Sequence, residues 1–153
     1  MENNLNEMDW TLPTQEDVIE NSLSGLNCAM QVLLYAAPAV GLSDEDALRL
    51  GSGFGGGMGH DGVCGCLTGA YMALGLHCGM AEPGDVSSMI RFRQYKAELD
   101  RRFSERFGSV NCPGVLEALK AETPDPGQVR EGGRCAPAII EACAILRDLL
   151  QEG

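Results

Sequence analysis

Hydrophobic residues recur every three or four positions along most of the chain, which is the spacing of an α-helix with one buried face. The first such stretch opens at Thr14-Gln-Glu-Asp17, which resembles a capping box, and it reaches Pro38 and Gly41. The pattern predicts one long helix over this range, whose apolar face is made by Ile19, Leu23, Leu26, Met30, Leu33 and Leu34.

The same spacing predicts the rest of the fold. No segment alternates between apolar and polar residues as a half-buried strand does, and no linker divides the chain. We therefore expect one compact all-α domain of about five to six helices over residues 14–153, after a flexible acidic N-terminus at 1–13. The remaining helices are expected from Ser43 to the glycine-rich stretch 51–62, from Val63, from Asp85 to Gly108, from Pro113 to about Lys120 and over 136–150, with an exposed loop at 121–134.

Residues 62–81 contain no formally charged side chain, and 20 such positions are long enough to cross a bilayer. Five of them are glycine, however, and no aromatic or basic anchors flank the segment. A helix that is apolar on all sides is also expected at the centre of a soluble bundle. We interpret the segment as the central buried helix, preceded by a glycine-rich loop, and expect no membrane span.

The chain has seven cysteines among 153 residues, more than a core of this size needs. The N-terminus has neither the basic region nor the apolar region of a secretory signal, which favours a cytoplasmic, reducing location. In such a compartment structural disulfides are rare. The cysteines therefore point to metal binding or redox chemistry.

The formal net charge of −11 disfavours nucleic acid and anionic membrane surfaces as partners. Residues 91–106 run against this trend, with six basic and three acidic side chains. That stretch suits an acidic redox partner protein, although a solvated helix face is the simpler interpretation.

Three cysteines are predicted at the beginning of a helix. Cys64 opens the uncharged helix, Cys112 directly precedes Pro113, and Cys135 precedes Ala136-Pro137. Free N–H groups and the helix dipole favour negative charge there, and a thiolate is the form that attacks disulfides or binds metals. The three positions together indicate a functional site.

The other cysteines give weaker signals. Cys28 falls inside the first predicted helix, where Gly25 costs about 1 kcal/mol of helix propensity and therefore suggests the close approach of a backbone or ligand. Cys66 could act as a resolving partner of Cys64, but side chains two positions apart on a helix point away from each other. Cys143 lies on an apolar helix face and is expected in the core.

Glycines suggest close packing around the same region. Gly65, Gly69 and Ala73 form a small-residue stripe on which a neighbouring helix, or the second copy of a homodimer, could pack. Residues 55–59 could fold over the site, with Met58 and His60 as auxiliary residues. The GxGxxG match at residues 51–56 follows a helix rather than a strand, so we expect no nucleotide. Neither CxxC nor HExxH occurs, so zinc has no familiar spacing.

These residues together resemble the redox-active C_GCAxxG_C_C family of small bacterial and archaeal proteins. The resemblance covers nearly the whole chain after the first dozen residues. It is carried by Asn27-Cys28-Ala29, by Phe54-Gly-Gly-Gly-Met58-Gly59, by Val63-Cys64-Gly65 with Gly69-Ala70, by the stretch from Glu98 to Cys112, and by Cys135.

The resemblance implies a redox role for four characteristic cysteines, Cys28, Cys64, Cys112 and Cys135. In one respect the chain departs from the family, because the family motif CGAxxG has alanine where this chain has Cys66. Related sequence also occurs with cytochrome-type electron-transfer modules, which by analogy favours an iron–sulfur cluster.

Three hypotheses remain open at this point. The first is an iron–sulfur cluster on the four cysteines, for electron transfer or redox sensing. The second is a metal-free thiol–disulfide or peroxide oxidoreductase, with Cys64 as a low-pKa nucleophile and Cys28 as its partner. The third is a non-redox zinc-binding or interaction protein. Whether the chain is an enzyme or an accessory to electron transfer is left undecided.

Overall fold

The computed structural model describes residues 8–122 and 133–152. Within them the chain forms seven α-helices and one short irregular turn, so the predicted all-α class is confirmed. No β-strand occurs in the described residues, only a single antiparallel bridge between Val63 and Asn111. The elements are α1 (Gln15–Leu23), α2 (Cys28–Val40), α3 (Asp44–Gly51), η1 (Gly57–Asp61), α4 (Gly65–Cys78), α5 (Val86–Phe107), α6 (Cys112–Glu122) and α7 (Ala136–Glu152).

The first predicted helix is two helices, and the prediction of one continuous helix was wrong. Helix α1 ends after Leu23, Gly25 takes a φ of +96°, and α2 begins at Cys28 after the N-cap Asn27. The two axes differ by 118°. Gly25 is needed for this left-handed turn and not for a close approach, because no atom lies within 4 Å of the place where its Cβ would be.

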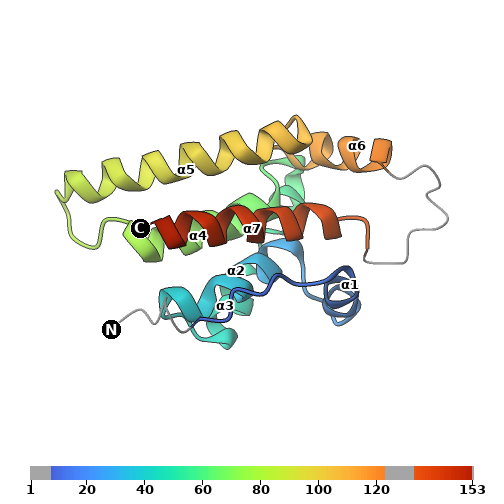
Figure 1. Cartoon of the computed structure of the whole chain (residues 1–153), viewed down its shortest axis with the longest axis horizontal. Helices are drawn as coiled ribbons and strands as arrows, with labels where there is room; N and C mark the ends of the chain where they lie inside the picture. Colours follow the sequence, from blue (N-terminus) through green and yellow to red (C-terminus); the bar gives the residue numbers. More distant parts are fainter. Residues whose placement is uncertain (1–7, 123–132, 153) are drawn as a thin grey trace.

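Helix α4 is central and is covered by α2, α5 and α7 (Figure 1). Its buried side chains include Leu67, Ala70, Ala73 and Leu74. This burial agrees with the interpretation of residues 62–81 as an internal helix. No single helix in the described residues has both the length and the apolar character needed to cross a membrane. The helices α1 and α2 meet the length and composition limits only when they are counted together, and they are bent relative to each other by 118°.

The small-residue stripe of α4 faces α2. A Cβ at Gly69 would lie 2.6 Å from the carbonyl oxygen of Ala29, and a Cβ at Gly65 would overlap the Cys28 sulfur. The helices therefore approach each other backbone to backbone where α2 begins. Since this stripe is occupied within the chain, it does not offer a surface to a second copy.

The predicted flexible N-terminus lies partly outside the described residues. Within the described part, Trp10 and Leu12 pack against the core, and the Tyr35 hydroxyl donates to the Trp10 carbonyl oxygen at 3.0 Å. The predicted loop at 121–134 also lies mostly outside the described residues.

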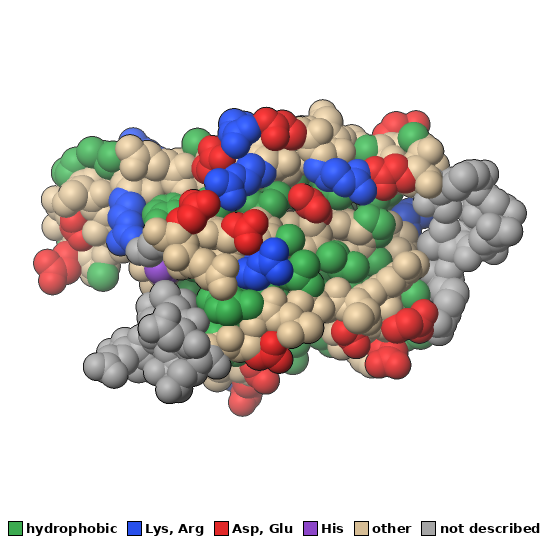
Figure 2. Space-filling view, in the orientation of Figure 1, with side chains coloured by type: hydrophobic (Ala, Val, Ile, Leu, Met, Phe, Trp, Pro, Cys, Tyr) green, Lys and Arg blue, Asp and Glu red, His purple; other side chains and the backbone are tan. Residues whose placement is uncertain are grey.

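Basic side chains on α5 are largely matched by carboxylates of the same chain. Figure 2 shows Lys and Arg interspersed with Asp and Glu along this helix. Arg102 pairs with Glu98 at 2.8 Å and with Glu152 at 3.3 Å, and Arg106 pairs with Glu122. This arrangement is that of a solvated helix face; docking of an acidic partner there stays a prediction.

Candidate functional site

Four helices begin at one place, and each begins at a cysteine. Cys28 is the first residue of α2, Cys64 is the N-cap of α4, Cys112 is the first residue of α6, and Cys135 directly precedes α7. Cys28 was expected inside a helix, but the break after Leu23 places it at a helix start. Free N–H groups and helix dipoles at these positions favour negative charge, but the pKa is lowered only for Cys28 and Cys64. For Cys112 and Cys135 burial raises the pKa, so the expectation of thiolates at those two helix starts was wrong.

Backbone hydrogen bonds hold the starts of α4 and α6 together. The Cys64 N–H donates to the Val110 carbonyl at 2.8 Å, and the Cys112 N–H donates to the Gly62 carbonyl at 2.8 Å. These two bonds flank the bridge between residues 63 and 111. Cys64 and Cys112, which are far apart in sequence, are thereby fixed on neighbouring segments.

The glycine-rich loop packs against the start of α2. The Asn27 side chain caps α2 and donates to the Gly51 carbonyl oxygen at 3.0 Å. A Cβ at Gly55 would lie 2.5 Å from the Cβ of Asn27, so only glycine fits there. Gly56 and Met58 have φ values of +64° and +61°, a region that costs a non-glycine residue free energy. The loop thus reaches Cys28 through backbone atoms.

Cys66 lies between Cys28 and Cys64, which contradicts the argument that it points away from Cys64. Its thiol hydrogen-bonds with both neighbouring sulfurs. The reason is local geometry: Cys64 is a cap residue with φ −53° and ψ 134°, so the two side chains do not follow the rotation of a regular helix. Cys66 is only 1% exposed.

Hydrogen bonding makes two of these thiols acidic. The pKa of Cys28 is lowered to about 6, chiefly by the Cys66 thiol, against the effect of burial and with help from the N–H groups of Gly56 and Ala29. The pKa of Cys64 is also lowered, again chiefly by Cys66 and also by the N–H groups of Cys66 and Leu67. Donors that stabilise the charged form lower a pKa in this way.

Cys66 has the opposite character. Its hydrogen bonds to Cys28 and Cys64, together with its burial, raise its pKa well above the ordinary value. It therefore remains a protonated thiol, whose single S–H can donate to Cys28 or to Cys64. The site combines thiolate and thiol side by side.

Cys112 and Cys135, the other two cysteines at helix starts, are affected by negative charge on Cys28 and Cys64. Burial raises the pKa of Cys112, and negative charge on Cys64 and Cys28 raises it further. Burial likewise raises the pKa of Cys135 to about 11, followed by charge on Cys28, Cys64 and Cys112. The four cysteines are thus near enough to influence one another. We call Cys28, Cys64, Cys66, Cys112 and Cys135 the cysteine cluster.

A pocket of about 260 Å³ gives access to this cluster. Cys28 and Cys135 both line it, together with Gly56 of the loop and Arg134. Leu26 and Ile139 supply its apolar wall. Cys28 is half-buried, whereas Cys64 is only 5% exposed. A small molecule therefore reaches Cys28 more readily than Cys64.

The other candidate residues lie elsewhere. Cys78 is at the far end of α4, roughly 20 Å along the helix from Cys64 at 1.5 Å per residue, and its thiol donates to the Leu74 carbonyl oxygen at 3.3 Å. Cys143 is fully buried in α7, as expected for a core residue. Met58 and His60 lie on the exposed side of the loop.

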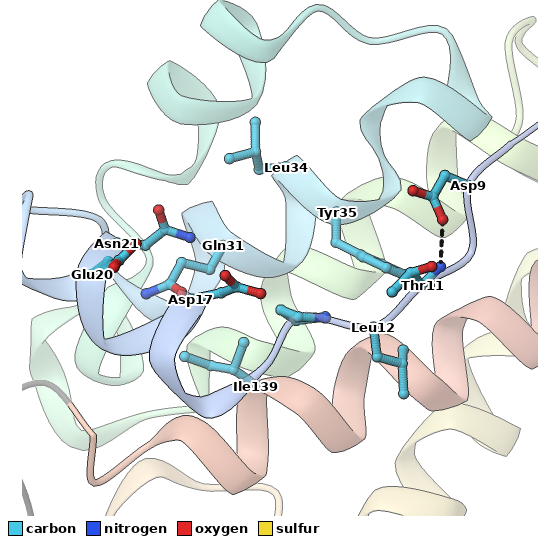
Figure 3. Close-up of a pocket in the computed structure, with 11 residues that line it drawn as sticks. Asp9, Thr11, Leu12, Asp17, Glu20, Asn21, Gln31, Leu34, Tyr35 and Ile139 are labelled. Carbon is cyan, nitrogen blue, oxygen red and sulfur yellow. Dashed lines mark hydrogen bonds between the residues drawn. The ribbon is translucent and has the colours of Figure 1, made fainter.

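A larger pocket, of about 370 Å³, lies between residues 9–13 and helices α1, α2 and α7 (Figure 3). Its lining includes Asp9, Asp17, Glu20 and Tyr35, and no cysteine. Burial raises the pKa of Tyr35 to about 12, so the phenol stays neutral. None of its lining residues is a cysteine, so this pocket offers no thiol.

The thiols of the cysteine cluster are suitable ligands for thiophilic metals, but no three of these described residues are placed to bind one ion. Thiolates are the ligands of iron–sulfur clusters and of many zinc sites. In residues 8–122 and 133–152 no three His, Cys, Asp or Glu side chains are placed to share one metal ion. Zinc binding and an iron–sulfur cluster both stay predictions.

A comparison with protein-family models finds a match, which covers the cysteine cluster. The family model described as "Putative redox-active protein (C_GCAxxG_C_C)" matches residues 26–149. The chain belongs to the C_GCAxxG_C_C family. The matched range contains all five residues of the cysteine cluster. No curated protein matches the chain, and no solved structure does.

Two glycines of the C_GCAxxG_C_C motif have a direct structural explanation. Gly65 leaves room for the Cys28 sulfur, and Gly69 leaves room for the Ala29 carbonyl. Cys66, which stands where the motif has alanine, points into the cluster. The contact between Cys66 and its two neighbours was missed from the sequence because it depends on the non-helical backbone of Cys64.

Proposed function

We propose that this chain is a thiol–disulfide redox protein in which Cys28 is the nucleophile and Cys66 the resolving thiol. The observation that carries the proposal is the contact of the Cys66 thiol with both Cys28 and Cys64. Attack by a thiolate on a disulfide, followed by attack of a second thiol, is the ordinary course of such exchange. The pocket beside Cys28 supports the assignment of the first attack.

The reaction conserves atoms and electrons. The Cys28 thiolate attacks one sulfur of a disulfide RS–SR′, forming a mixed disulfide with RS and releasing R′S⁻. Cys66 transfers its proton to the released thiolate, attacks the Cys28 sulfur and releases RS⁻. The products are a Cys28–Cys66 disulfide, R′SH and RS⁻, so two electrons pass from the protein to the substrate.

Cys64 is assigned a supporting role. The sequence alone favoured it as nucleophile, but it is more deeply buried than Cys28. As a second acidic thiol beside Cys66, it can accept the single S–H of Cys66 once Cys28 enters the mixed disulfide. Cys64 thereby keeps Cys66 in position for the second attack.

Single-turnover kinetics with a small disulfide test the proposal. Reduced protein is mixed with 2-hydroxyethyl disulfide, and the released thiol is followed with time. Cys28→Ser should abolish the fast phase, Cys66→Ser should stop the reaction at the mixed disulfide, and Cys143→Ser should match the unmodified chain. An undiminished fast phase in Cys28→Ser would overturn the assignment.

An iron–sulfur cluster is the second candidate. It is favoured by one observation, the placement of Cys28, Cys64, Cys112 and Cys135 at four helix starts within reach of one another's charge. These four residues would hold the cluster, and N–H groups at the helix starts could donate to their sulfurs. A bound cluster would supply one-electron transfer.

Metal analysis separates the two candidates. Iron, acid-labile sulfide and zinc are measured on protein purified without oxygen, and again after reconstitution. Equal iron and sulfide, lost in a Cys112→Ser variant but kept in Cys78→Ser, would establish the cluster. Absence of iron under both conditions would leave the thiol–disulfide function alone.

A further inference from the structure

The pocket beside Cys28 has a positively charged side chain in its lining, although the protein as a whole is acidic. Arg134 lines the pocket together with the two cysteines Cys28 and Cys135. The chain as a whole has a net charge of −11. The Arg134 side chain therefore places a positive charge at the pocket of Cys28 in a protein whose net charge is strongly negative.

The Arg134 guanidinium is available to a ligand. In the part of the chain that the structure describes, no carboxylate forms an ion pair with it, whereas Arg101, Arg102, Arg106 and Arg147 are all paired. The side chain is exposed. Arginine presents a planar fork of donors that matches a carboxylate in two hydrogen bonds.

The size and lining of the pocket limit what can enter. Its volume of about 260 Å³ is below the range of pockets that hold drug-sized ligands. Leu26 and Ile139 give it an apolar wall, and Cys28 gives it the reacting sulfur. The lining suits a short aliphatic chain with a sulfur at one end and an anionic group at the other.

We propose that this pocket selects small disulfides that carry a carboxylate, with Arg134 binding the carboxylate while the disulfide sulfur lies at Cys28. This inference rests on the proposed thiol–disulfide function and names its substrate class. Arg134 is a positioning residue for the substrate, since it touches the carboxylate and not the reacting sulfurs. The covalent steps are those given above, with RS as the carboxylate-bearing half.

Three disulfides of similar length and different charge provide the test: 3,3′-dithiodipropionate as the anion, 2-hydroxyethyl disulfide as the neutral compound and cystamine as the cation. Rate constants for the first attack are measured on the full chain, on Arg134→Gln, on Arg134→Lys and on Arg49→Gln. Arg49 lies on α3, paired with Glu45 at 2.6 Å, and does not line the pocket, so its variant removes one positive charge without altering the pocket lining.

Arg134→Gln should slow the anionic disulfide about fivefold, the order expected for one partly exposed ion pair. It should leave the neutral disulfide unchanged and leave cystamine unchanged or faster. Arg134→Lys should retain part of the anionic rate, and Arg49→Gln should change all three rates less than twofold.

Other results would overturn the inference in distinguishable ways. Equal slowing of the anion by Arg134→Gln and Arg49→Gln would mean that only the overall field acts. Equal slowing of all three compounds by Arg134→Gln would mean that Arg134 acts on the protein and not on the carboxylate. Failure of every disulfide to react at Cys28 in the unmodified chain would overturn the proposed function itself.

Discussion

The Cys28 sulfur occupies the space that a side chain on Gly65 would fill. Gly65 is the second residue of the CGAxxG-type motif, and Cys28 lies 37 positions earlier on another helix. The glycine is therefore required by a neighbour's sulfur and not by its own backbone conformation, which is helical. This relationship ties the motif to the chemistry of the site.

Gly65→Ala should impair the site more than the fold. The added methyl group must displace the Cys28 sulfur, so the reaction of Cys28 with a small disulfide should slow at least tenfold, since displacements near 1 Å at a reacting group can cost more than that. Gly75→Ala is the matched control, because it lies in the same helix and its added Cβ meets nothing closer than 3.9 Å. Equal rates in the two variants would contradict the account.

Gly69→Ala should destabilise the protein. A Cβ there would lie 2.6 Å from the Ala29 carbonyl oxygen, which forces α2 and α4 apart, and overpacking of this kind costs about 1–3 kcal/mol. The free energy of unfolding in urea measures the effect. Gly75→Ala should instead be neutral or stabilising, because alanine has the higher helix propensity.

Cys66→Ala should make Cys28 less acidic. The Cys66 thiol is the main cause of the low pKa of Cys28, which is about 6. In the unmodified chain, alkylation of Cys28 by iodoacetamide should rise with pH through a midpoint near 6. In the variant the midpoint should move towards the ordinary value near 9. A Cys78→Ala control should leave the midpoint in place, and an unmoved midpoint in Cys66→Ala would contradict the assignment.

Stability should increase between about pH 6 and pH 9 under reducing conditions. The Cys28 pKa is about 6 in the folded chain, against an ordinary value of 9.0, so the unfolded chain binds more protons in this window. Stability then rises with pH there, and it is lost as the pH falls through 6. Urea midpoints at pH 6 and pH 8.5 should differ less in Cys28→Ser.

Cys143→Ala is the control for this pH dependence. Burial raises the pKa of Cys143 to about 12 in the folded chain, against an ordinary value of 9.0, so it is mainly protonated in both states up to about pH 8.5 and adds no rise in stability there. Its variant should be less stable throughout but keep the rise of the unmodified chain. An equal loss of the rise in both variants would contradict the assignment to Cys28.

Much of the fold follows from the hydrophobic spacing, because five of the seven α-helices were expected as separate helices, α1 and α2 were expected as one, and the all-α class is observed. The break between α1 and α2 was missed for a physical reason. Leu23, Leu26 and Met30 continue a helical period across the break, so the apolar pattern cannot reveal it. Gly25 was the available signal, since glycine often ends a helix with a positive φ.

The site was only partly predictable. Cys64, Cys112 and Cys135 were expected at helix starts, and the structure places all three there and adds Cys28. The role of Cys66 required three-dimensional information, because its contact with Cys28 joins two helices. Arg134 gave no sequence signal, since its position beside the pocket depends on how α7 begins against α1 and α2.

Mapping the disulfide formed by one equivalent of a small disulfide oxidant tests the central claim most directly. Trypsin leaves Cys28 as the sole cysteine of the peptide ending at Arg49, and it leaves Cys64, Cys66 and Cys78 together in the peptide ending at Arg91. Fragmentation of the linked pair at Gly65 then distinguishes Cys64 from Cys66. The account predicts a Cys28–Cys66 link with the loss of two hydrogens; oxidised protein in which Cys28 remains a free thiol would contradict it.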